Sequence, residues 1–184
     1  MVSCTTLNAK LSWGVYMTDE PNQTAEVSAE QLRDAVNDLM ETVTALMEGE
    51  SSQAVFETAL SSHDALRDQL ATHRIDTASL AALQRIEQFI TAQAGQYYQT
   101  VSGEFDEQQE SRFIDLFARQ LLALDGIGPA TARQLFQLGI FTPEHFFAMP
   151  PKQVAQLQLP SATLARLIPL HAQHSSLAGG SETS

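Results

Sequence analysis

The first regular pattern of apolar residues along the chain predicts an amphipathic helix between about residues 28 and 49. Its seam advances by steps of four, three, four and three residues, which keeps the side chains on one side of a helix that packs in coiled-coil fashion. The seam consists of Leu32, Val36, Leu39, Val43 and Leu46. Residues 28–31 have the form of a capping box, and Gly49 is suited to ending the helix.

Two further helices follow with the same period. The second, about 52–72, has an apolar face made of Phe56, Leu60, His63, Leu66 or Arg67, and Leu70. The third can be capped by Asp76, and its face consists of Leu83, Ile86, Ile90, Ala94, Tyr97 and Val101. Three such helices predict an antiparallel bundle, closed in one chain or completed by a second copy. We interpret the apolar seams as the core of the bundle. They can also form a dimerisation surface, because three such helices often carry more apolar surface than they can cover alone.

Residues 102–108 interrupt the third helix, and from residue 111 the elements become shorter, with Gly and Pro between them. Residues 111–124 are expected to form one helix. No alternating strand-like run is present, so the fold class is all-α, with a bundle of three helices followed by a second helical domain. The predicted organisation is a flexible N-terminus (1–26), an acidic bundle (27–102), a linker (103–110), a second domain (111–172) and a disordered tail (173–184).

The sequence from residue 124 to 135 contains the most specific pattern in the chain. Gly126 and Gly128 permit a tight turn, and Ile127 between them can fill the gap between two helices. Pro129 suits the first turn of the next helix, and Ala132 is small enough for a close helix crossing. The amides of residues 128–131 would then face outward at the positive end of a helix dipole, which favours a phosphate.

This stretch resembles the helix-hairpin-helix motif, and residues 139–146 resemble the phrase that follows that hairpin in family X DNA polymerases and in the C-terminal domain of TfoX-like competence regulators. The resemblance covers none of the first 105 residues. It implies a helix-hairpin-helix domain that binds nucleic-acid backbone without sequence preference. The implied binding residues are Gly126, Ile127, Gly128, Ala130, Thr131 and Arg133, and the carbonyls of Leu122, Leu124 and Ile127 match positions that hold a monovalent cation in the family.

Residues 157–167 are loosely similar to residues 124–135, with both glycines lost. We interpret them as the second half of a tandem domain. Without glycines the backbone is less able to approach phosphate, so this half is expected to be structural. Lys152 and Arg166 would supply only peripheral contacts with nucleic acid.

Charge is divided unevenly along the chain. The net charge is −12, but residues 1–110 carry −13 and residues 111–172 carry +2. A near-neutral second domain can approach phosphate, whereas the acidic part would repel it, so any binding should be modest.

The sequence indicates no catalytic or metal centre. It has no phosphate loop with lysine, no Gly-x-Ser-x-Gly elbow and nothing similar to a polymerase catalytic domain. The five histidines are scattered, and His171 and His174 are interpreted as a surface pair on a fraying segment, so no metal or other cofactor is expected. A lone cysteine, Cys4, and the lack of a long apolar stretch favour a cytoplasmic protein without a membrane span. The polar run that follows Met17 is typical of a bacterial N-terminus. Translation starting at Met17 is an alternative to Met1.

The leading hypothesis is a non-enzymatic accessory protein that binds DNA more readily than RNA through the hairpin. In this hypothesis the acidic bundle serves for self-association or for docking a partner protein. The alternative is a protein-interaction or assembly module in which the hairpin is purely structural.

Overall fold

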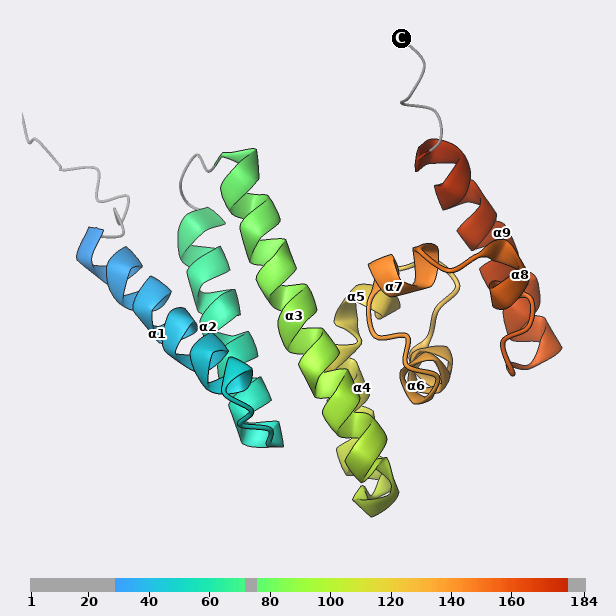
Figure 1. Ribbon diagram of the computed structural model, residues 1–184, viewed down its shortest axis with the longest axis horizontal. Coiled ribbons are helices and arrows are strands. Elements are labelled where there is room, and N and C mark those ends of the chain that lie inside the picture. The colour runs from blue at the N-terminus through green and yellow to red at the C-terminus, as the bar shows by residue number, and fades with distance from the viewer. Residues whose placement is uncertain (1–28, 72–75, 179–184) are drawn as a thin grey trace, which may run out of the picture.

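A computed structural model describes residues 29–71 and 76–178, with side chains described as far as residue 174, and all regular structure in these ranges is helical. The predicted all-α fold class is therefore confirmed. The longer helices are α1 (Ala29–Met47), α2 (Gln53–Ala71), α3 (Thr77–Val101), α4 (Glu107–Phe117) and α9 (Ser161–Ala178) (Figure 1). The shorter elements are the 3-10 helix η1 (Ser102–Glu104) and the helices α5 (Arg119–Leu122), α6 (Pro129–Gln137), α7 (Pro143–Phe147) and α8 (Pro151–Val154).

Helices α1, α2 and α3 lie next to one another in alternating directions, with α2 in contact with both of the others. Gly49 terminates α1 as predicted: it follows the last helical residue, Met47, closely and adopts a φ of +96°. The amide of Glu50 there donates to the carbonyl of Ala45, as in a Schellman motif. Asp76 is the N-cap residue of α3, and its carboxylate accepts a hydrogen bond from the amide of Ser79, so this predicted cap is confirmed. The predicted N-terminal segment 1–26 lies outside the described residues. The capping box predicted at residues 28–31 lies partly outside them, because residue 28 is not described.

The buried faces of α1 and α3 overlap the predicted ones but are shifted toward one edge of them. Leu39 and Leu46 on α1, and Leu83, Ile90 and Ala94 on α3, are buried as predicted. On α1 the buried residues are Ala35, Leu39 and Leu46, whereas Val36 is 40% exposed. On α3 Tyr98 is fully buried, and Tyr97 is only half-buried. A periodic pattern places the apolar stripe on one side of a helix, but the position of the neighbouring helix decides which edge of a wide stripe is covered. On α2 the buried set includes Leu66, and Arg67 points outward.

The larger of two hydrophobic clusters in the described residues runs from Leu46 at the end of α1 to Leu167 in α9, and the smaller one joins α1, α2 and α3. Aromatic rings fill the centre of the larger cluster, among them Tyr98 and Phe113, which stack at 5.5 Å, and Phe136, which meets Tyr98 edge to face. The larger cluster crosses the predicted boundary at 103–110, and Phe105 within that boundary packs against it. The two sides of the boundary therefore share a core, and their independent folding stays a prediction.

The single helix predicted over residues 111–124 is wrong in both its start and its continuity. Helix α4 already begins at Glu107, because Asp106 and Gln109 form a capping box. Helix α4 ends at Phe117, and Ala118 separates it from α5. The predicted linker is thus mostly η1 and the first turn of α4. At the other end of the chain, α9 continues to Ala178, beyond the predicted domain end at residue 172. No helix in the described ranges is long and apolar enough to cross a membrane.

Candidate nucleic-acid interface

The predicted turn between α5 and α6 has the geometry that its glycines suggest. Gly126 adopts a φ of +86°, a region that favours glycine. The amide of Ile127 donates to the carbonyl of Leu124 at 3.1 Å, and the Ile127 side chain is buried in the core. Pro129 is the first residue of α6, and Ala132 is fully buried. These four residues therefore play the local structural roles expected of them.

The N-terminus of α6 presents backbone amides that no side chain caps. Gly128 is the N-cap residue, and no side-chain hydrogen bond satisfies the first turn. Ala132 is the first residue of this turn whose amide reaches a helical acceptor, the carbonyl of Gly128 at 2.9 Å. Gly128 and Ala130 are exposed, and a β-carbon at Gly128 would meet nothing within 4 Å. The amides here are thus accessible to an anion. Thr131, which the resemblance implies as a binding residue, is only 8% exposed, so its side chain is largely withdrawn from solvent.

A second hairpin of the same form lies 32 residues further along the chain. Helix α8 (Pro151–Val154) corresponds to α5 (Arg119–Leu122), and the first residue of α9, Ser161, corresponds to Pro129 of α6. The amide of Leu164 donates to the carbonyl of Pro160, as Ala132 does to Gly128. Three buried residues correspond in the same register, with Ile127, Thr131 and Leu135 matched by Leu159, Thr163 and Leu167. The fully buried Ala132 and Phe136, however, correspond to the half-buried Leu164 and the exposed Ile168. The two segments match at a spacing of 32 residues, one residue less than the predicted alignment of Leu124 with Leu157, and their assignment as a tandem repeat stays a prediction.

Three of the five basic residues in 111–172 are paired with carboxylates. Arg112 lies 3.4 Å from Glu57 of α2. Arg133 lies 3.3 Å from Glu110 of α4, in an ion pair without hydrogen-bond geometry. Arg119 contacts two carboxylates at once. The charge of +2 read from this part of the sequence is therefore largely compensated by acids from elsewhere, and Arg133 is less available for phosphate than expected.

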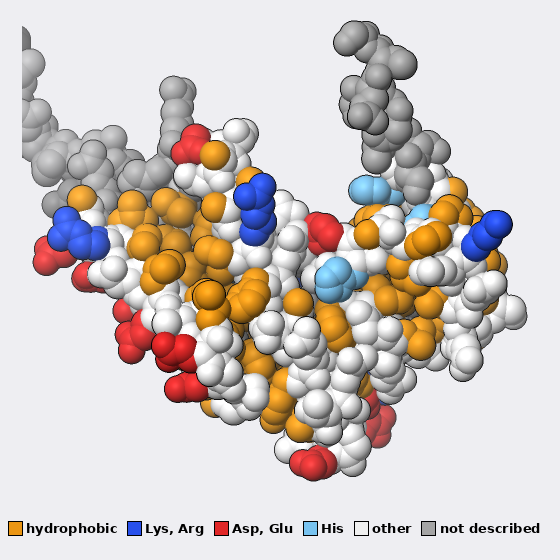
Figure 2. Space-filling view, viewed as in Figure 1, with side chains coloured by type: hydrophobic (Ala, Val, Ile, Leu, Met, Phe, Trp, Pro, Cys, Tyr) orange, Lys and Arg blue, Asp and Glu red, His pale blue; other side chains and the backbone are white. Residues whose placement is uncertain are grey.

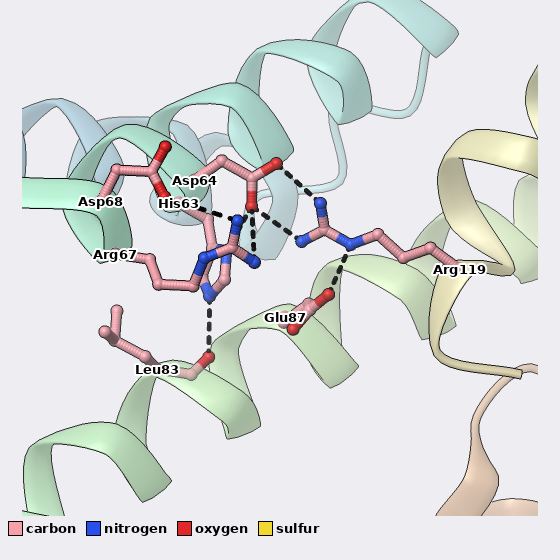
Figure 3. Close-up of polar contacts among 7 residues, drawn as sticks. All are labelled: His63, Asp64, Arg67, Asp68, Leu83, Glu87 and Arg119. Carbon is pink, nitrogen blue, oxygen red and sulfur yellow. Dashed lines mark hydrogen bonds and ion pairs between the residues drawn. The ribbon is translucent and has the colours of Figure 1, made fainter. Parts of the chain in front are cut away.

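Figure 3 shows how Arg119 joins α5 to the first part of the fold. Its two terminal nitrogens donate to both carboxylate oxygens of Asp64 at 2.6 and 2.8 Å, and its Nε donates to Glu87 at 2.6 Å. Burial alone would raise the pKa of Asp64, but the hydrogen bonds and charge of Arg119 lower it below its usual value. The network ties α2, α3 and α5 together at the base of the hairpin.

His63 adds a further contact to this network. It is buried, with Nε2 3.1 Å from the carbonyl oxygen of Leu83 and Nδ1 3.2 Å from Asp64. The ring therefore bridges α2 and α3. Its placement on the apolar face of α2 was predicted, whereas its polar contacts follow only from the packing.

Glu110, the partner of Arg133, is itself held in place by Tyr98. The buried Tyr98 hydroxyl donates to Glu110. Burial and the neighbouring carboxylate both raise the pKa of Tyr98 above its usual value, so this tyrosine stays protonated. Glu110 is therefore fixed where it attracts Arg133, and sequence reasoning had assigned it no role.

Arg166 is the basic residue that the structure places beside the first hairpin. A β-carbon at Gly126 would lie 3.7 Å from Cβ of Arg166. The Nε of Arg166 donates to the carbonyl of Ala162, four residues earlier, and no described carboxylate pairs with it. Lys152 on α8 is likewise exposed and without an acidic partner among the described residues. The two residues expected to be peripheral are thus the two basic residues of 111–172 without an acidic partner among the described residues, and Arg166 adjoins the glycine turn.

The described residues contain no group of three or more His, Cys, Asp or Glu side chains placed to hold a metal ion. The interpretation of His171 and His174 as a surface pair is wrong. His171 is buried against Phe146, whereas His174 stacks on Phe147 at 3.8 Å. A cleft of about 730 Å³ lies between α3, α5, α7 and α9, and none of the predicted nucleic-acid-binding residues lines it.

Comparisons with protein-family models, with curated proteins and with solved structures find no match for this chain.

Proposed function

We propose that this protein is a non-enzymatic accessory protein that binds nucleic-acid backbone, DNA in preference to RNA, through the turn formed by residues 126–131. The proposal treats the two hairpins as a tandem helix-hairpin-helix domain. The observation that carries it is the uncapped N-terminus of α6 at Gly128, which is open to solvent, in a turn whose Gly126 lies beside Arg166, a cation without a carboxylate partner among the described residues. Unsatisfied amides, the helix dipole and a nearby cation together favour a phosphate oxygen.

The charges around this turn limit the expected affinity. Arg133 is engaged by Glu110, which leaves Arg166 and Lys152 as the cations free to displace counterions. Two phosphate contacts correspond to a slope of about −1.8 when the logarithm of the binding constant is plotted against that of the salt concentration. Backbone amides distinguish no bases, so the affinity should be similar for unrelated sequences.

The test is a fluorescence-anisotropy titration with double-stranded and single-stranded oligonucleotides at low and moderate salt. The informative variant is Gly128→Val, because Gly128 has a φ of −99° and open space around it. The fold should tolerate this change, while the branched side chain should block a phosphate and abolish binding. Gly103→Val is the matched control, since a β-carbon at Gly103 also meets nothing within 4 Å and lies outside the hairpin.

Replacing single cations tests the role of Arg166. Arg166→Ala should weaken binding about equally for all sequences and reduce the salt slope by about one unit. Arg133→Ala should have less effect, because its charge is already compensated by Glu110. The proposal would be refuted by the absence of wild-type binding at low salt, or by unchanged affinity of Gly128→Val.

The alternative function is a protein-interaction module with purely structural hairpins. The net charge of −12 and the ion pairs that occupy Arg112, Arg119 and Arg133 favour it. It predicts that neither double-stranded nor single-stranded oligonucleotides bind even at low salt, although circular dichroism shows the helical content of the folded protein.

A further inference from the structure

Helix α1 carries a second apolar seam beside the one that it buries. Val36, Met40 and Met47 are 40%, 55% and 74% exposed, and Val43 between them is half-buried. At 3.6 residues per turn these four side chains form a stripe about 60° wide. The buried residues Ala35, Leu39 and Leu46 lie on the adjoining side of the helix. The seam therefore lacks a covering helix among the described elements.

The open seam belongs to a wider apolar face. Figure 2 shows hydrophobic side chains gathered over α1 and α3, with few charged groups between them. Half-buried Ile86 and Phe89 of α3 pack against the core. Of the large apolar side chains that are exposed in the described ranges, four of six belong to these two helices, namely Val36, Met40, Met47 and Leu80. A contiguous patch of this kind typically marks an interaction surface.

The spacing of the seam fits a second copy of the same helix. Val36, Met40, Val43 and Met47 follow at steps of four, three and four, which read the same in either direction. When a second α1 is laid antiparallel across the first, Val36 lies opposite Met47 of the other copy and Met40 opposite Val43. Each of the four residues thus meets an apolar partner under a single twofold axis, as an isologous interface requires.

Charge is consistent with the same register. The antiparallel arrangement that matches the apolar residues also places Arg33 opposite Glu50 of the second copy. Arg33 has no acidic partner among the described residues, and Glu50 is exposed just beyond the end of α1. A parallel arrangement would instead place Arg33 beside Arg33, where like charges repel.

We propose that two copies of this chain associate through antiparallel pairing of α1, along the seam formed by Val36, Met40, Val43 and Met47. Knobs-into-holes packing along the seam removes its apolar surface from water, and the symmetry leaves no open edge for further copies. This surface contains none of the residues assigned to nucleic acid, so the proposal does not depend on the proposed function.

Disulfide cross-linking tests the antiparallel register directly. In a Cys4→Ser background, the double variant Val36→Cys and Met47→Cys should form a covalent dimer on mild oxidation, because position 36 of one copy faces position 47 of the other. The two positions within one helix are about 16 Å apart, too far for an internal disulfide. The single variant Val36→Cys should not cross-link, since its copies would be about 16 Å apart along the pair. Cross-linking by the single variant would indicate parallel pairing and overturn the proposal.

The association itself is measured by light scattering over a range of protein concentrations. The wild type should reach twice the 20.1 kDa mass of the chain. Met40→Asp should remain monomeric with unchanged helical content, because an ionised carboxylate would have to be buried between two copies. Ile168→Asp, an exposed apolar residue of α9, is the matched control and should dimerise normally. A wild type that stays monomeric at every concentration, or equal effects of both substitutions, would refute the proposal.

Discussion

The substitution Gly95→Ala tests the contact between α3 and the hairpin region, because the sign of the resulting change in stability depends on that contact. Gly95 lies inside α3, where helix propensity alone predicts that alanine stabilises by about 1 kcal/mol. However, a β-carbon at Gly95 would lie 2.7 Å from Cε1 of Phe141 and closer still to Cδ1 and Cγ. Carbon atoms in contact prefer about 3.5–4.0 Å, so the ring would have to move by roughly 1 Å. We therefore expect the packing term to outweigh the propensity term.

The expected size follows from the surroundings of Phe141. Its ring is buried and packs edge to face on Phe136 at 5.3 Å, so it has little room to withdraw. Overpacking of a core typically costs about 1–3 kcal/mol. Because the ring of Phe141 is strongly restrained, we expect a cost at the upper end of this range. Subtracting the gain in helix propensity leaves a net destabilisation of roughly 1–2 kcal/mol. For a chain of this size, that corresponds to a fall in Tm of about 2–8 °C.

Thermal and denaturant unfolding, followed by circular dichroism, provides the measurement. Gly103→Ala is the control, because its β-carbon would meet no atom within 4 Å, and its stability should be nearly unchanged. If Gly95→Ala raises the stability by the amount expected from propensity alone, the close packing of α3 on Phe141 is wrong, and with it the placement of the hairpins against α3.

Two further changes probe the core and the network at the base of the hairpin. Ile90→Asp should unfold the protein or lower its Tm markedly, because a carboxylate would occupy a fully buried position, and an unchanged melting curve would contradict that burial. Because the pKa of Asp64 is lowered in the folded state, its ion pair with Arg119 stabilises the protein above the unfolded pKa of about 4, and this contribution is lost as the pH falls through the folded pKa. Asp64→Asn should therefore be less stable than the wild type at neutral pH, and the difference in the free energy of unfolding should shrink as the pH falls. Denaturant unfolding at several pH values measures this difference. A difference that does not depend on pH would exclude the ion pair as its cause.

The sequence determined the features that depend on neighbouring residues. The positive φ of Gly49 and Gly126, the cap of Asp76 and the start of α6 at Pro129 follow from the properties of residues within one turn. The all-α class and the presence of three long helices follow from hydrophobic periodicity in the same way. The capping box at Asp106 and Gln109 was also readable locally, and recognising it would have placed the start of α4 correctly.

The tertiary structure decided which edge of each helix is covered and which charges are free. Val36 and Ala35 are adjacent on α1, so only the position of α2 determines that Ala35 is the buried one. Arg133 and Arg166 have the same charge in the sequence, yet Glu110, 23 residues before Arg133, pairs with the first and leaves the second unpaired. Electrostatic pairing depends on distances of a few ångströms between segments remote in the chain, and no local pattern records those distances.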